Sequence, residues 1–399
     1  PTLGLINGAA YAPIIFVLAV VLAVVQPRSI DPPVRIDPPL AWLCAAFLIW
    51  SAASTIWSID PIASLDGIMQ MALISAGTLG LLAFGYDDRT FAEPHRRIAL
   101  LVAAIGLPAG SALAAVDLAT EHRLLAILAP GAADWAPSDY NRGIAYLAVL
   151  AWPILLAVRN RLGWTGAVAA ALPLVVLTFL SQSAGAKLQL AAGTLVLLVT
   201  LWRPRLVTTA FWVGLPVAAW MGPAVIRWTF PYAASATSGL ERSWLHRLEI
   251  WDYMSARIVE RPWAGWGFST AKQIPVTPEE LVGFSQVAEA GIYPHNQWIE
   301  LWVYGGGISV CIALTLVLLI VRRISRMPRQ SQPFAHAALA SALVVSAVNF
   351  EVTTDSWWAA LAATALLFRF AAGYRTPAST DPFRPETALS RGSTGIDRR

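Results

Sequence analysis

Charged side chains are scarce in this chain of 399 residues: Asp, Glu, Lys and Arg make up 13% of it, about half of the roughly 25% usual in soluble domains. Hydrophobic residues make up 57%, and the mean hydropathy is +0.59. Apolar stretches of about 20 residues, the length that crosses a bilayer as a helix, recur along most of the sequence. The composition therefore excludes an ordinary soluble domain and predicts a polytopic helical membrane protein.

Cysteine is also rare, and Cys44 and Cys311 both fall inside apolar stretches. Neither a disulfide framework nor a cysteine-based metal site is implied. The motifs D-x-D and H-E-x-x-H are missing, as is any Cys/His ligand cluster. The net charge of +4 comes without a basic and aromatic tract, and no nucleic-acid partner is expected.

Apolar ranges predict eleven membrane helices, so the expected fold class is all-α. The predicted spans are 8–25, 40–57, 62–85, 98–116, 141–158, 162–181, 184–202, 206–228, 296–321, 334–350 and 356–372. The sequence begins without Met, and a further span before Pro1 would make twelve. The sequence leaves open whether the protein has eleven or twelve membrane helices.

Arginine is distributed unevenly between the connections. The loops "QPRSIDPPVRIDPP", "YDDRTFAEPHRR", "RNR", "RPR" and "RRISRMPRQ" together hold 13 Arg, whereas the short alternate connections "SIDP", "SQSAG" and "EVTTD" hold none. Short loops rich in Lys and Arg stay in the cytoplasm. The arginine loops and the C-terminus are therefore predicted to be cytoplasmic, and the alternate connections to face outward.

The sequence divides into four parts. Residues 1–228 and 296–372 are predicted to hold the membrane helices, and 373–399 form a cytoplasmic tail rich in Pro, Ser and Thr that is expected to be disordered. Residues 229–295 are the only soluble-looking region of any size. A loop this long inside a compact domain is usually functional or disordered.

Residues 239–260 predict an amphipathic helix on the outer membrane surface. Ser238 and Glu241 match a capping box, and Pro262 marks the far end. The predicted apolar stripe consists of Trp244, Leu248, Trp251, Met254 and Ile258. Arg247 falls on this stripe, where its guanidinium either snorkels to water or holds a buried anion such as phosphate.

Two further polar residues stand at predicted helix ends. Lys187 lies about one turn into the span at 184–202, where it either snorkels or serves a ligand. His295 directly precedes the span at 296–321. A lone His is more often structural than catalytic, but its near-neutral pKa suits a general base.

Several stretches together resemble the O-antigen ligase and O-antigen polymerase superfamily. "HRLEIWDYMSARIVERPWAGWGF" (246–268) resembles its R-x-x-x-W … P-x-x-G-x-G segment, and "HNQWIELWVYGGG" (295–307) its H-N signature. "SQSAGAK" is similar to its S-R-G segment, and "NRGIAYLAVLAWPILL" to its N-x-x-A helix. Two positions depart from the pattern, because Ala184 stands where Arg is common and Tyr304 where an acidic residue is common.

The resemblance implies a metal-independent membrane glycosyltransferase without a cofactor, in the bacterial inner membrane. Its donor would be a glycan on an undecaprenyl diphosphate carrier, used at the periplasmic face. The acceptor would be a lipid A–core sugar, giving ligation in lipopolysaccharide biosynthesis, or another carrier-linked glycan, giving polymerisation. Ligation is slightly favoured.

The resemblance also suggests roles for individual residues. His295 matches the signature His, which is the proposed base that deprotonates the acceptor hydroxyl. Arg247, with Lys187 and Arg142 as weaker candidates, would hold the donor diphosphate. Asn296 and Trp251 would orient the base or contact a sugar. A transporter or flippase for lipid-linked glycans remains the alternative from another class, although the sequence shows no pair of similar halves.

The arginine asymmetry predicts that residues 229–295 lie outside the cytoplasm. A reporter that is active only after export, fused near Thr277, should be active, and the same reporter fused after Arg329 should be silent. Activity at Thr277 of a reporter that works only in the cytoplasm would contradict this orientation.

Overall fold

The computed structural model describes residues 37–86, 93–121, 123, 140–235, 242–276 and 293–373. Within these residues the regular secondary structure is entirely helical, which confirms the predicted all-α class. The α-helices are α3 (Pro38–Ala53), α4 (Pro61–Tyr86), α5 (Glu93–Ala119), α7 (Tyr140–Leu180), α8 (Ala184–Trp202), α9 (Pro204–Ser235), α10 (Arg242–Glu260), α13 (Gln297–Ser325), α14 (Gln332–Ser346) and α15 (Asp355–Gly373), with short 3-10 turns at Ser54–Ile56 and Ala271–Gln273.

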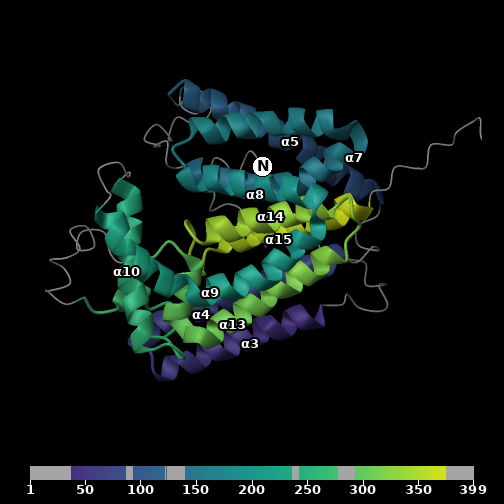
Figure 1. Cartoon of the computed structure of the whole chain (residues 1–399). Helices are drawn as coiled ribbons and strands as arrows, with labels where there is room; N and C mark the ends of the chain where they lie inside the picture. The colour runs from purple at the N-terminus through teal and green to yellow at the C-terminus, as the bar shows by residue number, and fades with distance from the viewer. Residues whose placement is uncertain are drawn as a thin grey trace, which may run out of the picture.

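Seven of the described helices are long and apolar enough to cross a membrane: α3, α4, α5, α7, α8, α9 and α13. The shorter α14 and α15 lie between α8 and the group formed by α3, α4, α9 and α13 (Figure 1). There α14 packs along α8, and α15 packs against α7 and α4. The chain is therefore a polytopic helical membrane protein, as its composition predicts.

Helix α7 is a hairpin of two membrane-length halves. At 41 residues it is longer than one crossing needs, and Gly163 breaks it with a φ of 71°. The guanidinium of Arg159 lies 4.8 Å from the ring centroid of Trp164 across this break. The two halves correspond to the predicted spans 141–158 and 162–181, so the tight "RNR" connection does reverse the chain.

The remaining predicted spans agree closely with the helices. Ten of the eleven predicted ranges overlap a described helix, and the range 8–25 lies outside the described residues. The main difference is α9, which continues to Ser235 rather than ending at 228. The predicted capping box before α10 and the C-terminal tail also lie outside the described part of the chain.

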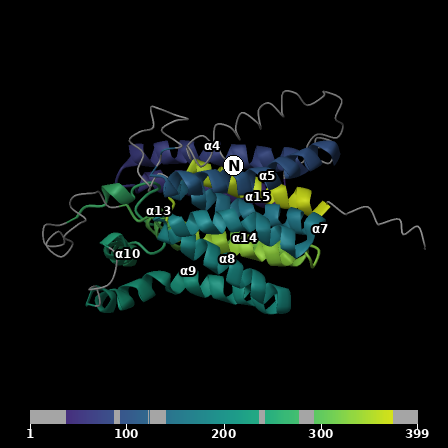
Figure 2. The same cartoon turned by 90° about the horizontal axis from the view of Figure 1, so that it is seen from above.

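The two ends of the helix bundle differ. Helix α10 stands across one end, nearly at right angles to the long helices (Figures 1 and 2). The short turns 181–183 and 347–354 lie at this end as well. The break inside α7 and the connections from α8 to α9 and from α13 to α14, which the sequence marks as rich in arginine, lie at the opposite end (Figure 1).

The first half of α7 forms the centre of the bundle. Every residue from Gly143 to Val158 is buried, because α5, α14 and α15 surround this half. Its many Ala residues let these neighbours approach closely, which is the usual way helices pack in membranes. The beginning of α7, just before this segment, is therefore rigidly placed.

Helix α13 is interrupted early, and a loop fills the interruption. Gly305 and Gly306 have non-helical backbone angles, with a φ of 62° at Gly306. Residues 262–267, "PWAGWG", lie against this break. Three backbone hydrogen bonds join the segments: Trp266 N–H to Val303 C=O (2.7 Å), Gly267 N–H to Tyr304 C=O (3.2 Å) and Gly307 N–H to Pro262 C=O (2.8 Å). The loop thus satisfies backbone groups that the broken helix leaves without helical partners. We call this contact the α13 splice.

The end of α3 and the turn between α3 and α4 also form hydrogen bonds with the α13 splice. The contacts are the Trp50 indole N–H to Gly305 C=O (2.9 Å), the Trp57 indole N–H to Ala264 C=O (3.1 Å), Ile59 N–H to Trp266 C=O (3.2 Å) and Phe268 N–H to the Ser54 hydroxyl (3.0 Å). Segments far apart in the sequence are therefore fixed together at the end of the bundle that carries α10.

Gly306→Ala should destabilise the protein by more than about 2 kcal/mol, because an added Cβ would overlap the backbone of Trp263 and the positive φ is strained for alanine. Gly80→Ala in α4 is the matched control, since a Cβ there meets nothing within 4 Å. Thermal unfolding of the purified proteins in detergent measures both. Equal melting temperatures for the two variants would contradict the role of the α13 splice.

Candidate active site

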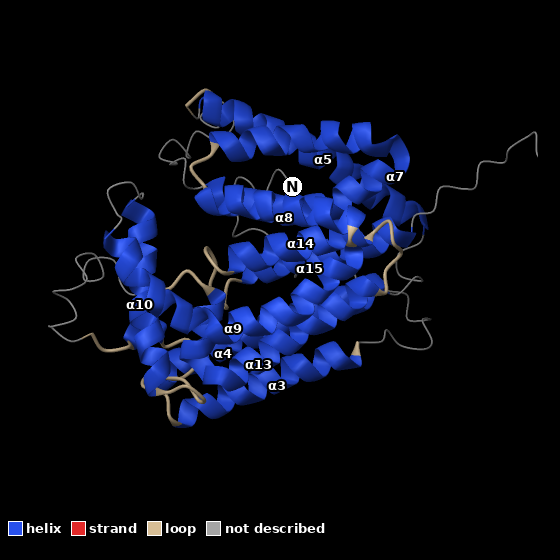
Figure 3. Ribbon diagram, viewed as in Figure 1, coloured by secondary structure: helices blue, strands red, loops and turns tan. Residues whose placement is uncertain are grey.

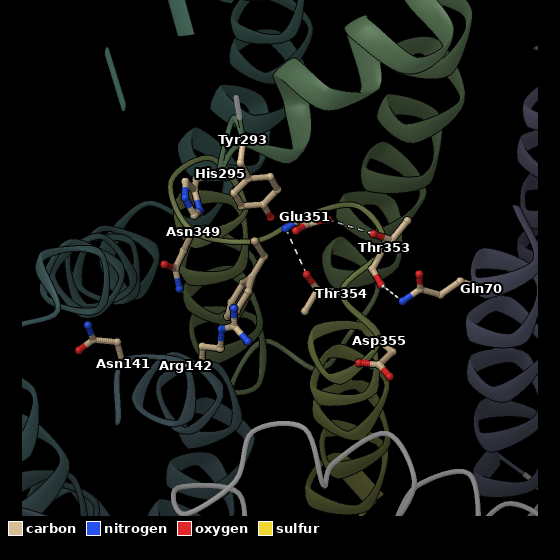
Figure 4. A pocket seen from close by; sticks show the side chains of 11 residues that line it. Gln70, Asn141, Arg142, Tyr293, His295, Asn349, Glu351, Thr353, Thr354 and Asp355 are labelled. Carbon is tan, nitrogen blue, oxygen red and sulfur yellow. Dashed lines mark hydrogen bonds between the residues drawn. The ribbon is translucent and has the colours of Figure 1, made fainter. Parts of the chain in front are cut away.

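A cavity of about 380 Å³ opens at the end of the bundle near α10 (Figure 4). Four parts of the chain line it: α4, the start of α7, the residues before α13, and the loop between α14 and α15. Its lining consists of Gln70, Asn141, Arg142, Tyr293, His295, Asn349, Phe350, Glu351, Thr353, Thr354 and Asp355. Two of the sequence-predicted site residues, His295 and Arg142, therefore share one pocket.

The backbone holds His295 in a fixed position. Its φ of 48° places it in the left-handed region, which is uncommon for a residue other than glycine. On one side, the indole N–H of Trp251 donates to the carbonyl of Pro294 at 2.5 Å. On the other, the Asn296 side chain caps α13 and accepts from the backbone N–H groups of Trp298 and Ile299 at 3.0 and 3.2 Å.

These contacts show where two further predicted residues lie. Asn296 is buried and its carboxamide oxygen is occupied as the N-cap of α13. Trp251 is buried on the inner face of α10 and touches the segment before His295. Neither is among the residues that line the pocket. The two contacts hold the backbone on either side of His295 in place.

The imidazole of His295 has one nitrogen engaged. A ring nitrogen hydrogen-bonds the backbone of Asn349, and the Tyr293 ring packs edge-on with its centroid 4.1 Å away. An N–H that donates to a carbonyl leaves the other nitrogen as an acceptor in the neutral ring. The geometry therefore suits a base that takes one proton from a group in the pocket.

The pKa of His295 is lowered from its usual value to about 4. Burial is the largest cause, followed by the positive charges of Arg247, His246 and Arg142. The hydrogen bond to Asn349 opposes these effects only in part. At neutral pH the ring is therefore uncharged and ready to accept a proton.

Arg142 stands one turn into α7, and its guanidinium points into the pocket (Figure 4). The first turn of α7 is anchored by Tyr140, whose hydroxyl donates to the carboxylate of Asp117 at 2.7 Å. Asp117 and Tyr140 are both buried, with 2% and 3% exposure. The arginine therefore extends from a rigid helix start.

Arg247 approaches the site from α10. Its side chain is half-buried, and its guanidinium lies 5.5 Å from the Trp244 ring centroid. It does not line the pocket, but its charge is the second largest cause of the lowered pKa of His295. The buried face of α10 includes Ile250, Trp251 and Met254, so Arg247 belongs to the inward side that the helical pattern predicts.

Lys187 lies apart from the pocket lining. It is half-buried in the first turn of α8, which Ser183 caps by accepting from the N–H of Ala186 at 3.2 Å. The same turn reaches the end of α14, since a Cβ on Gly185 would lie 3.5 Å from Val348. Lys187 therefore sits at the same end of the bundle, beside the segment that leads to Asn349.

The floor of the pocket is a loop, residues 349–355. In the sequence, the only feature that distinguishes this connection is its lack of arginine. It contributes Asn349, Glu351 and Asp355 to the lining. Three side chains tether its backbone: Glu300 accepts from Val352 N–H (2.6 Å), Gln297 donates to Glu351 C=O (2.7 Å) and Gln70 donates to Thr353 C=O (3.0 Å). Glu300 is fully buried. No periodic pattern marks such a loop, so sequence reasoning missed it.

Among the described residues, no group of three or more His, Cys, Asp or Glu side chains is placed to hold a metal ion. The polar groups of the pocket are instead one guanidinium, one imidazole, one phenol, three carboxamides, two carboxylates and two threonine hydroxyls. This set can bind a phosphate, remove a proton and hydrogen-bond a polyhydroxylated ligand.

Residues 167–310 match the family model described as O-antigen ligase. Over these residues the chain is similar to the O-antigen ligase family. A Rickettsia conorii protein named as a candidate polysaccharide ligase is 20% identical over 317 residues, which cover 78% of this chain and 74% of the relative. A protein of the same description from Rickettsia bellii is 22% identical over 325 residues, or 79% and 76% of the two chains.

The O-antigen ligase match covers only part of the site. The matched residues include Lys187, α10 with Arg247, His295 and the α13 splice. Arg142 and the floor loop 349–355 lie outside it. The structure brings these flanking parts to the matched segment and so completes the pocket.

The acid limb of the pH–activity profile should reflect the lowered pKa of His295. With His295 as a general base, kcat/KM should hold until the pH falls well below 6.5 and decline near pH 4, because the base must be unprotonated. An anionic ligand bound beside the ring would stabilise its protonated form, and the acid limb of kcat should then lie at higher pH than that of kcat/KM. Both limbs at pH 6.5, measured with the purified enzyme, would contradict the described environment.

Proposed function

We propose that the protein transfers a glycan from an undecaprenyl diphosphate carrier to a hydroxyl of an acceptor sugar. The reaction would take place at the periplasmic face of the bacterial inner membrane, with a lipid A–core saccharide as acceptor. The observation that carries the proposal is the pocket that His295 and Arg142 share, in which burial and the charges of Arg247 and Arg142 lower the pKa of the imidazole. The family match and the names of the relatives as polysaccharide ligases agree with this chemistry.

The cations provide the donor end of the site. A diphosphate carries several negative charges, and a guanidinium can donate two parallel hydrogen bonds to a phosphate. Arg142 lies in the pocket and Arg247 approaches from the surface helix, so the diphosphate would be held between them. Lys187 would add a charge at the edge of this region.

His295 would act on the acceptor. Its free ring nitrogen takes the proton of the acceptor hydroxyl as that oxygen attacks the anomeric carbon of the donor sugar. The bond from this carbon to the diphosphate oxygen breaks, and undecaprenyl diphosphate leaves with the electron pair. The proton on His295 then passes to the leaving diphosphate or to water. Such general base catalysis contributes a factor of about 10²–10⁴.

Replacing His295 tests the base. His295→Ala should lower kcat by at least about 10²-fold while donor binding and thermal stability change little. Transfer from a synthetic undecaprenyl-diphosphate glycan to purified lipid A–core, followed by gel mobility of the product, measures this. Transfer near the wild-type rate would remove His295 as the base. Polymer formed on the carrier, with none on lipid A–core, would instead identify a polymerase.

The arginines can be tested by a change that keeps the charge. Arg247→Lys should raise KM for the donor and lower activity by about tenfold or more, because an ammonium cannot reproduce the paired hydrogen bonds of a guanidinium. Arg257→Lys, whose guanidinium pairs with Glu260 on the same helix at 2.7 Å, is the matched control. If both variants kept full activity, Arg247 would only snorkel.

A further inference from the structure

The pocket contains two carboxylates that the proposed reaction does not use. Glu351 and Asp355 both belong to the floor of the cavity. Figure 4 shows His295 and Tyr293 on one side of the pocket and the residues of the segment 353–355 across from them. One wall thus carries the base, while another carries carboxylates and neutral polar groups.

These acceptor groups are held in place but still have free lone pairs. One oxygen of Glu351 lies 3.8 Å from the Lys272 ammonium, and the other accepts from the Thr353 hydroxyl at 3.4 Å. Asp355 accepts from its neighbour's N–H at 2.5 Å through one oxygen and is otherwise exposed. Each carboxylate oxygen can accept a further hydrogen bond from a ligand.

The chemistry of this wall defines what it can bind. Carboxylates accept hydrogen bonds from hydroxyl or ammonium groups, and they repel a second anion. The donor diphosphate is therefore excluded from this wall. A sugar ring presents several hydroxyls and fits the requirement. The carboxylates accordingly mark the position of the other substrate.

We propose that Glu351 and Asp355 form the subsite for the acceptor sugar, and that this subsite selects a neutral or amino sugar over an acidic one. The subsite rests on the proposed function, because it assigns the second substrate of that reaction. Sugars that carry a carboxylate or a phosphate beside the reacting hydroxyl would be poor acceptors, since they place an anion against Glu351 and Asp355.

Direct binding tests the subsite without requiring transfer. The probes are the methyl glycosides of glucose, glucosamine and glucuronic acid, which share one ring and differ in charge. Saturation-transfer NMR on the full-length protein in nanodiscs should show Kd values for the glucoside and glucosaminide at least about tenfold lower than for the glucuronide. In the double variant Glu351→Gln and Asp355→Asn, the discrimination against the glucuronide should fall to about twofold or less.

Two control variants test whether the discrimination against the glucuronide depends on the charge beside Glu351. Lys272→Gln removes the cation beside Glu351 and should increase the discrimination. Glu260→Gln removes an exposed carboxylate of α10 and should leave the discrimination unchanged. Equal binding of all three glycosides, no binding of any of them, or unchanged discrimination in the double variant would overturn the proposal.

Failure of the subsite can be told apart from failure of the transferase. In one outcome, the glycosides show the charge preference while the lipid-linked glycan is transferred to no acceptor. That result would support the subsite and refute the proposed transfer reaction. If transfer proceeds with neutral and acidic acceptors alike, the transferase stands and the subsite is refuted.

Discussion

The α13 splice is the contact on which the other features of this end of the molecule depend. A helix broken inside a membrane protein exposes backbone carbonyls that have no water to satisfy them, and each unsatisfied group costs several kcal/mol. Here the carbonyls of residues 303–305 accept from two backbone N–H groups and from the indole of Trp50. The glycines permit this because the loop backbone occupies the space where side chains would stand. With the loop fixed, the end of α10 and the turn between α3 and α4 are fixed too.

Much of this architecture follows from the sequence, because the membrane imposes strong and simple constraints. Runs of about 20 apolar residues separated by arginine loops predicted the helices, and even the tight reversal at Gly163 agrees with them. The apolar stripe of α10 likewise placed Arg247 on the inward side. Hydropathy and charge act over whole helices, so their signal survives in a single sequence.

The rest of the site depends on contacts between distant segments, which leave no periodic pattern. The sequence shows the glycines of 305–307 and those of 265–267. It does not show that the backbones of these two segments hydrogen-bond each other. It shows Glu351 and Asp355 in a short connection without indicating that His295 faces them. Asn296 illustrates the same limit: its place beside His295 left an orienting role and a sugar contact both open, and only the fold shows that its side chain caps α13. Such roles are set by tertiary geometry and become readable only with the fold.

The placement of Trp251 and Arg247 one turn apart on α10 has a mechanical consequence. The indole of Trp251 is bonded to the residue before His295, and Arg247 exerts its charge on the same ring. A displacement of α10 would therefore move the imidazole of His295 and the guanidinium of Arg247 together, whereas Arg142 belongs to the start of α7, whose following segment is buried in the bundle.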